Sequence, residues 1–122
     1  MKTKWEKSPA ELVKFLEDAM ARVQCEKRTM FGFPAYFIQG NMFMGAFGNV
    51  LFIRLSASDR AVVFKKHPAV IPFAPVADRP MKEYVALSKE VYQDSGVFDL
   101  LLEKSVEYVS SLPMKEKKRK TP

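Results

Sequence analysis

The stretch TMFGFPAYFIQGNMFMGAFGNVLFIRL, residues 29–55, decides the fold of this chain. It is rich in aromatic and β-branched residues, and a glycine followed by an asparagine divides it twice, at 40–41 and 48–49. This dipeptide suits a type II′ turn, whose first central residue needs a positive φ. The stretch therefore predicts an antiparallel meander of three strands, over 29–39, 42–47 and 50–55. Pro34 has no N–H to donate, so we expect the first strand to lie at an edge or to carry a bulge there.

Amphipathic segments on either side of the meander predict helices. The first follows the capping signature Ser8-Pro9-Ala10-Glu11 and runs for about 15 residues, because its apolar positions recur at helical spacing. A short helix is expected over 59–66, started by Ser56 and ended by Pro68. The last helix is expected over 96–112, with Asp94 or Ser95 as its cap and Pro113 as its stop.

Two further strands are expected between the second and the third helix. The segment IPFAPVADRP, residues 71–80, holds four prolines and predicts one irregular edge strand followed by a turn. Residues 81–92 contain another strand. The chain is thus expected to be α+β, with an antiparallel sheet of about five strands and three helices in the order α-β-β-β-α-β-β-α. We expect residues 1–113 to form a single domain and residues 114–122 to be a disordered tail.

Two-residue turns would fix the register of the meander and so the residues on each face. The first turn would pair Tyr36 with Gly45, and the second would pair Gly45 with Phe52. One face would then be wholly apolar and lie under the helices: Phe33, Ala35, Phe37, Met42, Met44, Ala46, Leu51, Ile53 and Leu55. The other face would be aromatic but interrupted by a phenol and a guanidinium: Tyr36, Ile38, Phe43, Phe47, Val50, Phe52 and Arg54.

The second face is the predicted functional surface. Three helices can cover one face of a sheet, which would leave an aromatic patch free for a protein partner or a second copy of the chain. Its expected contact residues are Tyr36, Phe43, Phe47, Phe52 and Arg54. In the alternative hypothesis, the last helix or the proline-rich segment folds over this face and makes it a second core layer.

The residues offer no constellation for catalysis. His67 is the only histidine and Cys25 the only cysteine, and their separation has no metal-ligand spacing. We also find no Gly-rich phosphate loop between a strand and a helix. We therefore expect a protein that is not an enzyme and that holds no metal or cofactor. A small-ligand pocket, if there is one, should lie between the proline-rich segment and the sheet, close to Arg54, Arg79, Tyr36 and Tyr84.

The net charge of +6 belongs to the two ends of the chain. KEKKRK, residues 115–120, carries +4, the first seven residues carry +2, and the rest is balanced. The basic side chains of the tail could contact phosphates: Lys115, Lys117, Lys118, Arg119 and Lys120. A nucleic-acid-associated protein, with these ends and an aromatic sheet face that stacks bases, is therefore an alternative function. No apolar run is long enough to span a membrane, and the lone cysteine favours the cytoplasm.

Two separated motifs resemble the TfoX N-terminal domain family. The first is Met30-Phe31-Gly32, followed by an aromatic strand, the Gly40-Asn41 pair and then Met42-Phe43. The second is Asp78-Arg79-Pro80-Met81, followed by Tyr84, with aspartate where the family pattern has glycine. The resemblance covers residues 10–113 and implies an α+β fold.

The resemblance also implies a function. The family is named for a bacterial regulator of competence genes, and its regulator-type members carry a second, C-terminal domain. It has no catalytic residues that could be carried over to this chain. We therefore expect a stand-alone, cytoplasmic member that acts as a small non-enzymatic regulatory or protein-interaction domain.

Overall fold

The computed structural model describes residues 8–30, 32–75 and 80–114. Along the chain the elements are α1 (Ala10–Met20), β1 (Glu26–Met30), β2 (Phe33–Ile38), β3 (Asn41–Phe47), β4 (Val50–Arg54), α2 (Ala57–Lys66), β5 (Ile71–Pro72), β6 (Tyr84–Leu87), α3 (Lys89–Tyr92) and α4 (Ser95–Ser110). Residues 115–122 of the predicted tail, including Lys115, Lys117, Lys118, Arg119 and Lys120, lie outside the described residues. Arg79 of the candidate pocket lies outside them as well.

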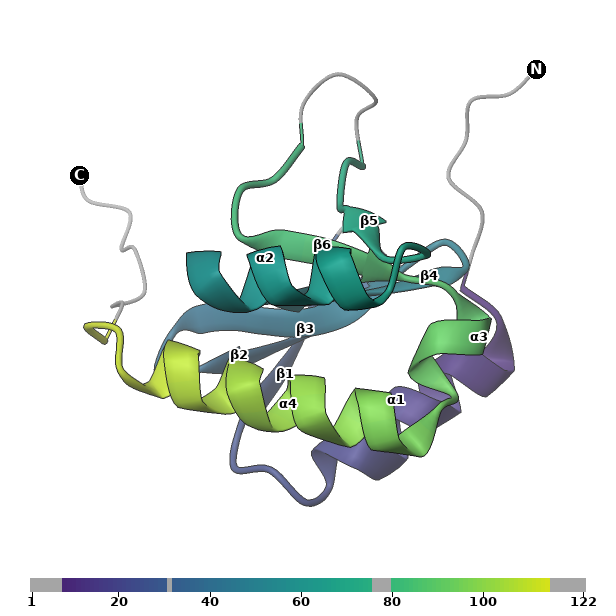
Figure 1. Cartoon of the computed structure of the whole chain (residues 1–122). Helices are drawn as coiled ribbons and strands as arrows, with labels where there is room; N and C mark the ends of the chain where they lie inside the picture. The colour runs from purple at the N-terminus through teal and green to yellow at the C-terminus, as the bar shows by residue number, and fades with distance from the viewer. Residues whose placement is uncertain (1–7, 31, 76–79, 115–122) are drawn as a thin grey trace.

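The strands form one antiparallel sheet in the order β1-β2-β3-β4-β6-β5, and α2 and α4 cross in front of it (Figure 1). The predicted α+β class is confirmed. The described chain has six strands instead of about five, and the short α3 adds a fourth helix. The extra strand, β1, begins at Glu26, before the predicted first strand over 29–39. The chain then turns at Gly32, whose φ is 83°, so that β1 and β2 pair with each other.

The pairing of β1 with β2 changes the position of Pro34. Pro34 lies opposite Thr29, so β2 is an internal strand and β1 forms the edge. Because β1 continues the sheet, the predicted edge position of Pro34 is wrong. The bulge lies in the neighbouring strand β3, where Phe43 is the extra residue opposite the step from Tyr36 to Phe37.

The two turns of the meander differ in how well the sequence predicts them. Gly48 has a φ of 59°, and Phe47 pairs with Val50, as predicted. The predicted turn at 40–41 is wrong by one residue. Gln39 and Gly40 are its central residues, with φ of 52° and 82°, and Asn41 is the first residue of β3.

The observed pairing of β2 with β3 differs by one residue from the predicted pairing, so the side chains of β2 lie on the opposite faces of the sheet from those predicted. A shift of one residue moves every side chain of a strand to the opposite face. Tyr36 and Ile38 therefore pack in the core under the helices, while Ala35 packs on the second face of the sheet.

The helix ends follow the predicted signals in part. Ser56 accepts a hydrogen bond from Asp59 N, and Asp94 accepts one from Val97 N, so both cap their helices as predicted. The predicted Ser8 cap is wrong. Pro9 is the N-cap of α1 and makes no side-chain cap bond.

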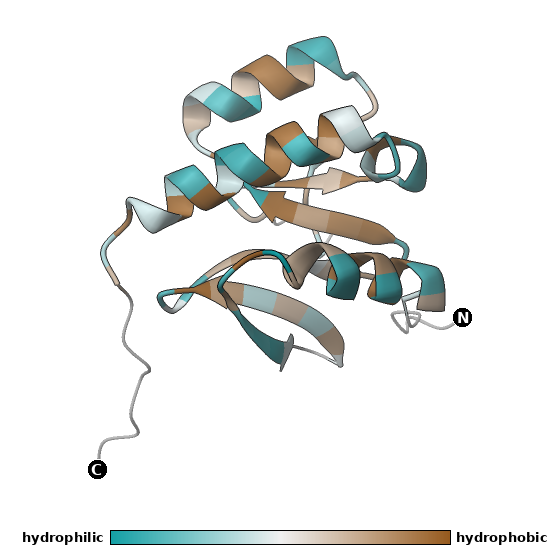
Figure 2. Ribbon diagram, turned by 90° about the horizontal axis from the view of Figure 1, so that it is seen from below, coloured by the Kyte–Doolittle hydropathy of each residue, from teal (hydrophilic) through white to brown (hydrophobic). Residues whose placement is uncertain are grey.

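Two apolar cores result, one on each face of the sheet. The larger joins α1, α3, α4 and Val63 of α2 to strands β2, β3, β4 and β6. Figure 2 shows the central strands mostly brown, whereas α2 and α4 alternate between brown and teal. The helices thus turn their apolar sides to the sheet. The smaller core lies on the second face and carries the candidate site.

Candidate interaction site on the second face of the sheet

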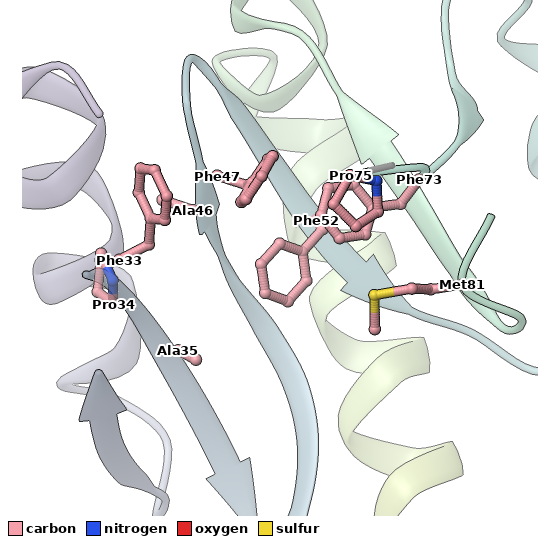
Figure 3. Close-up of a pocket in the computed structure, with 9 residues that line it drawn as sticks. All are labelled: Phe33, Pro34, Ala35, Ala46, Phe47, Phe52, Phe73, Pro75 and Met81. Carbon is pink, nitrogen blue, oxygen red and sulfur yellow. The ribbon is translucent and has the colours of Figure 1, made fainter. Parts of the chain in front are cut away.

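The second core is built from strands β2, β3, β4 and β6 and from the segment that follows β5. Its buried members are Ala35, Met42, Phe52, Phe73 and Ala86. Phe73 stacks on Phe52 with ring centroids 4.7 Å apart and an interplanar angle of 19°. Around this pair lie Phe33 and Phe47, whose rings are tilted against each other with centroids 4.9 Å apart (Figure 3).

Backbone hydrogen bonds hold Phe73 over the sheet. Its N–H donates to the carbonyl of Tyr84 at 3.1 Å, and its carbonyl accepts from the N–H of Met81 at 2.8 Å. The proline-rich segment is therefore anchored to the start of β6. For Phe52, which is 1% exposed, the structure favours the hypothesis of a second core layer.

The five residues predicted as one exposed surface are separated by the structure. Tyr36 and Phe43 are 3% and 0% exposed and lie on the helix side. Their predicted exposure is wrong for two reasons: β2 pairs with β3 one residue away from the predicted register, and Phe43 is the bulge residue of β3. Phe47 and Arg54 remain partly exposed. Only Phe47, Phe52 and Arg54 therefore lie away from the main core.

An open groove adjoins the second core. It has a volume of about 490 Å³ and lies between the β3–β4 turn and the segment Ile71–Ala74, with Pro9 at its rim. Ile71 is 56% exposed there, beside the partly exposed Val50. The groove therefore presents apolar side chains to solvent. We call it the β5 groove.

The space inside the aromatic cluster is much smaller. The cavity drawn in Figure 3 measures about 20 Å³, which is room for one water molecule. Arg54 and Tyr84 line neither this cavity nor the β5 groove. The β5 groove thus lies where a pocket was predicted, between the proline-rich segment and the sheet, but the predicted polar side chains Arg54, Tyr36 and Tyr84 do not line it.

Arg54 instead belongs to a polar network at the start of β6. Its Nε and Nη2 lie 2.8 Å and 2.7 Å from Oε1 of Glu83, and the hydroxyl of Tyr108 donates to Oε2 of Glu83 at 2.9 Å. The hydroxyl of Tyr84 donates to the carbonyl of Met42 at 2.8 Å. The network thus ties α4 and β4 to the end of the proline-rich segment.

Burial and hydrogen bonding set the ionisation of this network. Burial opposes the charge of Glu83, but the hydrogen bonds from Arg54 and Tyr108 outweigh it and hold the pKa of that carboxyl below its usual value. Burial and the neighbouring carboxylate raise the pKa of Tyr108. At neutral pH the network is therefore a satisfied ion pair with a neutral phenol. Sequence reasoning missed Glu83 and Tyr108, because neither belongs to a motif.

The described residues form neither a metal site nor a membrane-spanning helix. No group of three histidine, cysteine, aspartate or glutamate side chains within the described ranges is placed to hold a metal ion. Among the helices described here, none is both long and apolar enough to cross a bilayer.

These features define a small α+β domain with a helix-covered sheet and a partly covered aromatic second face. Comparison with family models gives the family: the TfoX N-terminal domain model matches residues 16–109. The chain therefore belongs to the TfoX N-terminal domain family. Searches of curated proteins and of solved structures found no match.

Proposed function

We propose that this chain is a non-enzymatic regulatory domain of the cytoplasm that acts by binding another protein through the β5 groove. The observation that carries the proposal is the groove itself, in which Ile71 and Val50 present apolar surface beside Phe47. Contiguous exposed apolar patches on soluble proteins mark interaction sites, whereas single exposed apolar residues are normal. Membership of the TfoX N-terminal domain family supports a TfoX-like domain in general.

The groove suits an apolar side chain of a partner. Strands β3, β4, β5 and β6 contribute to its walls, and the stacked rings of Phe52 and Phe73 support them. The groove is therefore preformed in the unbound domain. A preformed site loses little conformational entropy when it binds. Pro72 lacks an N–H, which makes β5 a poor template for adding another strand. Side-chain contacts are therefore expected to dominate the interaction.

Substitutions at the rim test the proposal. Proteins captured by the intact chain from its own cells would be purified, and their affinities measured by calorimetry. Val50→Asp and Ile71→Asp should each weaken binding by about tenfold or more, since each places a charge in the contact. The control is Lys82→Glu, which changes charge at an exposed position outside the groove lining.

Sedimentation of the intact chain covers the case in which the partner is a second copy. Dimers that dissociate on Val50→Asp support the proposal. A chain that stays monomeric and captures no protein contradicts it. A partner that binds both rim variants as tightly as the parent chain contradicts it too.

A further inference from the structure

A second surface lies on the helix side of the molecule, between α2 and α4. The two helices run across the front of the sheet (Figure 1) and enclose a cavity of about 60 Å³. Val62 and Val97 line it together with Leu100. Val62 and Leu100 are 52% and 50% exposed, although Val63 and Leu101, their neighbours in sequence, are buried. Two helices thus bring half-exposed aliphatic side chains to the mouth of this cavity. We call the cavity and its rim, with Val62 and Leu100, the α2–α4 groove.

Lysines border these aliphatic side chains. Lys66 and Lys104 line the α2–α4 groove, and the only acidic side chain in its lining is Asp59. Neither lysine is in an ion pair among the described residues, whereas Lys14, Lys27 and Lys89 each pair with a carboxylate. The border of the groove therefore carries unbalanced positive charge.

The opposite flank of α4 has the reverse charge. Asp99, Glu103 and Glu107 follow one another at four-residue spacing, which places them along one side of the helix. Arg22 lies 3.9 Å from Asp99, and Glu103 and Glu107 are exposed. An acidic partner would be repelled from this flank and attracted to the lysine flank.

We propose that the α2–α4 groove docks an amphipathic helix of a protein partner whose apolar face is flanked by aspartate and glutamate. An apolar groove between two helices accepts a third helix through side chains spaced three and four residues apart. Val62 and Leu100 would contact that apolar face, and Lys66 and Lys104 would pair with the flanking carboxylates. The site lies on the opposite side of the sheet from the β5 groove, so either interaction can fail without the other.

A designed peptide provides a direct probe. The acidic probe is a fluorescent helix of roughly 20 residues, with leucine at helical spacing and glutamate on both sides. The basic probe has lysine in place of every glutamate. Fluorescence anisotropy with the intact protein should show saturable binding of the acidic probe and weaker binding of the basic one.

Matched variants separate docking from simple charge attraction. Leu100→Gln and Lys104→Glu should each weaken binding of the acidic probe by about tenfold. Lys82→Glu makes the same charge change outside the groove lining and should leave the affinity nearly unchanged. Loss of binding with Lys104→Glu but not with Leu100→Gln would indicate attraction of any polyanion, nucleic acid included, and would overturn the proposal.

Chemical-shift mapping on the unmodified protein avoids dependence on the folding of the variants. Amide shifts caused by the acidic probe should concentrate in α2 and in the first three turns of α4. Equal binding of both probes would count against the proposal. So would the absence of binding, or shifts confined to the second face.

Discussion

Arg54 and Glu83 form a charge pair in which two guanidinium nitrogens meet a single carboxylate oxygen, at 2.8 and 2.7 Å. Glu83 holds this position with a φ of 74°, which is unusual for a residue with a side chain. Its carbonyl also accepts from Leu55 N at 2.8 Å. The pair therefore joins the end of β4 to the start of β6 through side chains and backbone together. The segment that carries Phe73 ends at this junction.

Replacement of Glu83 by glutamine should make stability less sensitive to acid. The pKa of Glu83 is lower in the folded protein than its usual value of about 4.3, so its ionised form stabilises the fold above that pH. The stabilisation is lost as the pH falls through the depressed pKa. Near neutral pH, Glu83→Gln should lower the free energy of unfolding by about 1–2 kcal/mol, because the pair is only partly buried.

Urea unfolding followed by circular dichroism, from neutral pH down to about pH 3, measures this effect. The curves of the parent and of Glu83→Gln should converge at the acidic end. Glu103→Gln is the control, since Glu103 is an exposed side chain on α4. A stability difference that stays constant over the whole pH range would refute the assigned role of the carboxylate.

Gly45 should not tolerate a side chain. A Cβ atom there would lie 2.5 Å from Cζ of Phe52 and 2.7 Å from the carbonyl oxygen of Pro34. Gly45→Ala should therefore lower the free energy of unfolding by about 1–3 kcal/mol. In Gly96→Ala, the new Cβ would lie 3.6 Å from Oδ1 of Asp94, an ordinary contact. Thermal denaturation should show that variant unchanged or stabilised by up to about 1 kcal/mol, because alanine favours helix. Equal effects at the two glycines would argue against the close packing of β2, β3 and β4.

Aspartate substitutions should distinguish core from rim on the second face. Phe52→Asp places an unpaired charge in a fully buried site and should cost about 3–5 kcal/mol, enough to unfold much of a marginally stable domain. Val50→Asp changes a partly exposed residue at the start of β4 and should leave the fold intact. Circular dichroism and sedimentation measure both outcomes. A folded Phe52→Asp monomer would show that Phe73 does not cover this face in solution.

Replacing Gln39 by asparagine should stabilise the β2–β3 turn. Gln39 has a φ of 52°, a conformation that asparagine adopts more readily than glutamine. Gln39→Asn creates an Asn-Gly pair at the centre of the turn and should raise the free energy of unfolding by about 0.5–1 kcal/mol. Gln93→Asn serves as the control, because Gln93 has an ordinary φ of −84°. No gain, or a gain of the same size at both positions, would contradict the observed turn.

The sequence by itself determined those parts of the fold that depend on near neighbours. The Gly48-Asn49 turn sets the pairing of Phe47 with Val50 directly beside it, so the hairpin of β3 and β4 is predicted correctly. Helix periodicity and the caps at Ser56 and Asp94 likewise act within a few residues. The two motifs around Met30 and Pro80 were sufficient to indicate the family.

Only the tertiary structure decided the register of β2 and the cover of the second face. The side-chain amide of Asn41 donates to the backbone carbonyl of Pro113 at 3.1 Å, and the backbone carbonyl of Met42 accepts from the hydroxyl of Tyr84. These partners are 72 and 42 residues away in the chain, so no local pattern reveals that Asn41 belongs to β3 and not to the turn. Phe73 likewise reaches Phe52 from a proline-rich segment without periodicity. Pattern rules describe how a residue fits its own helix, strand or turn, whereas register and cover are selected by the packing of distant segments.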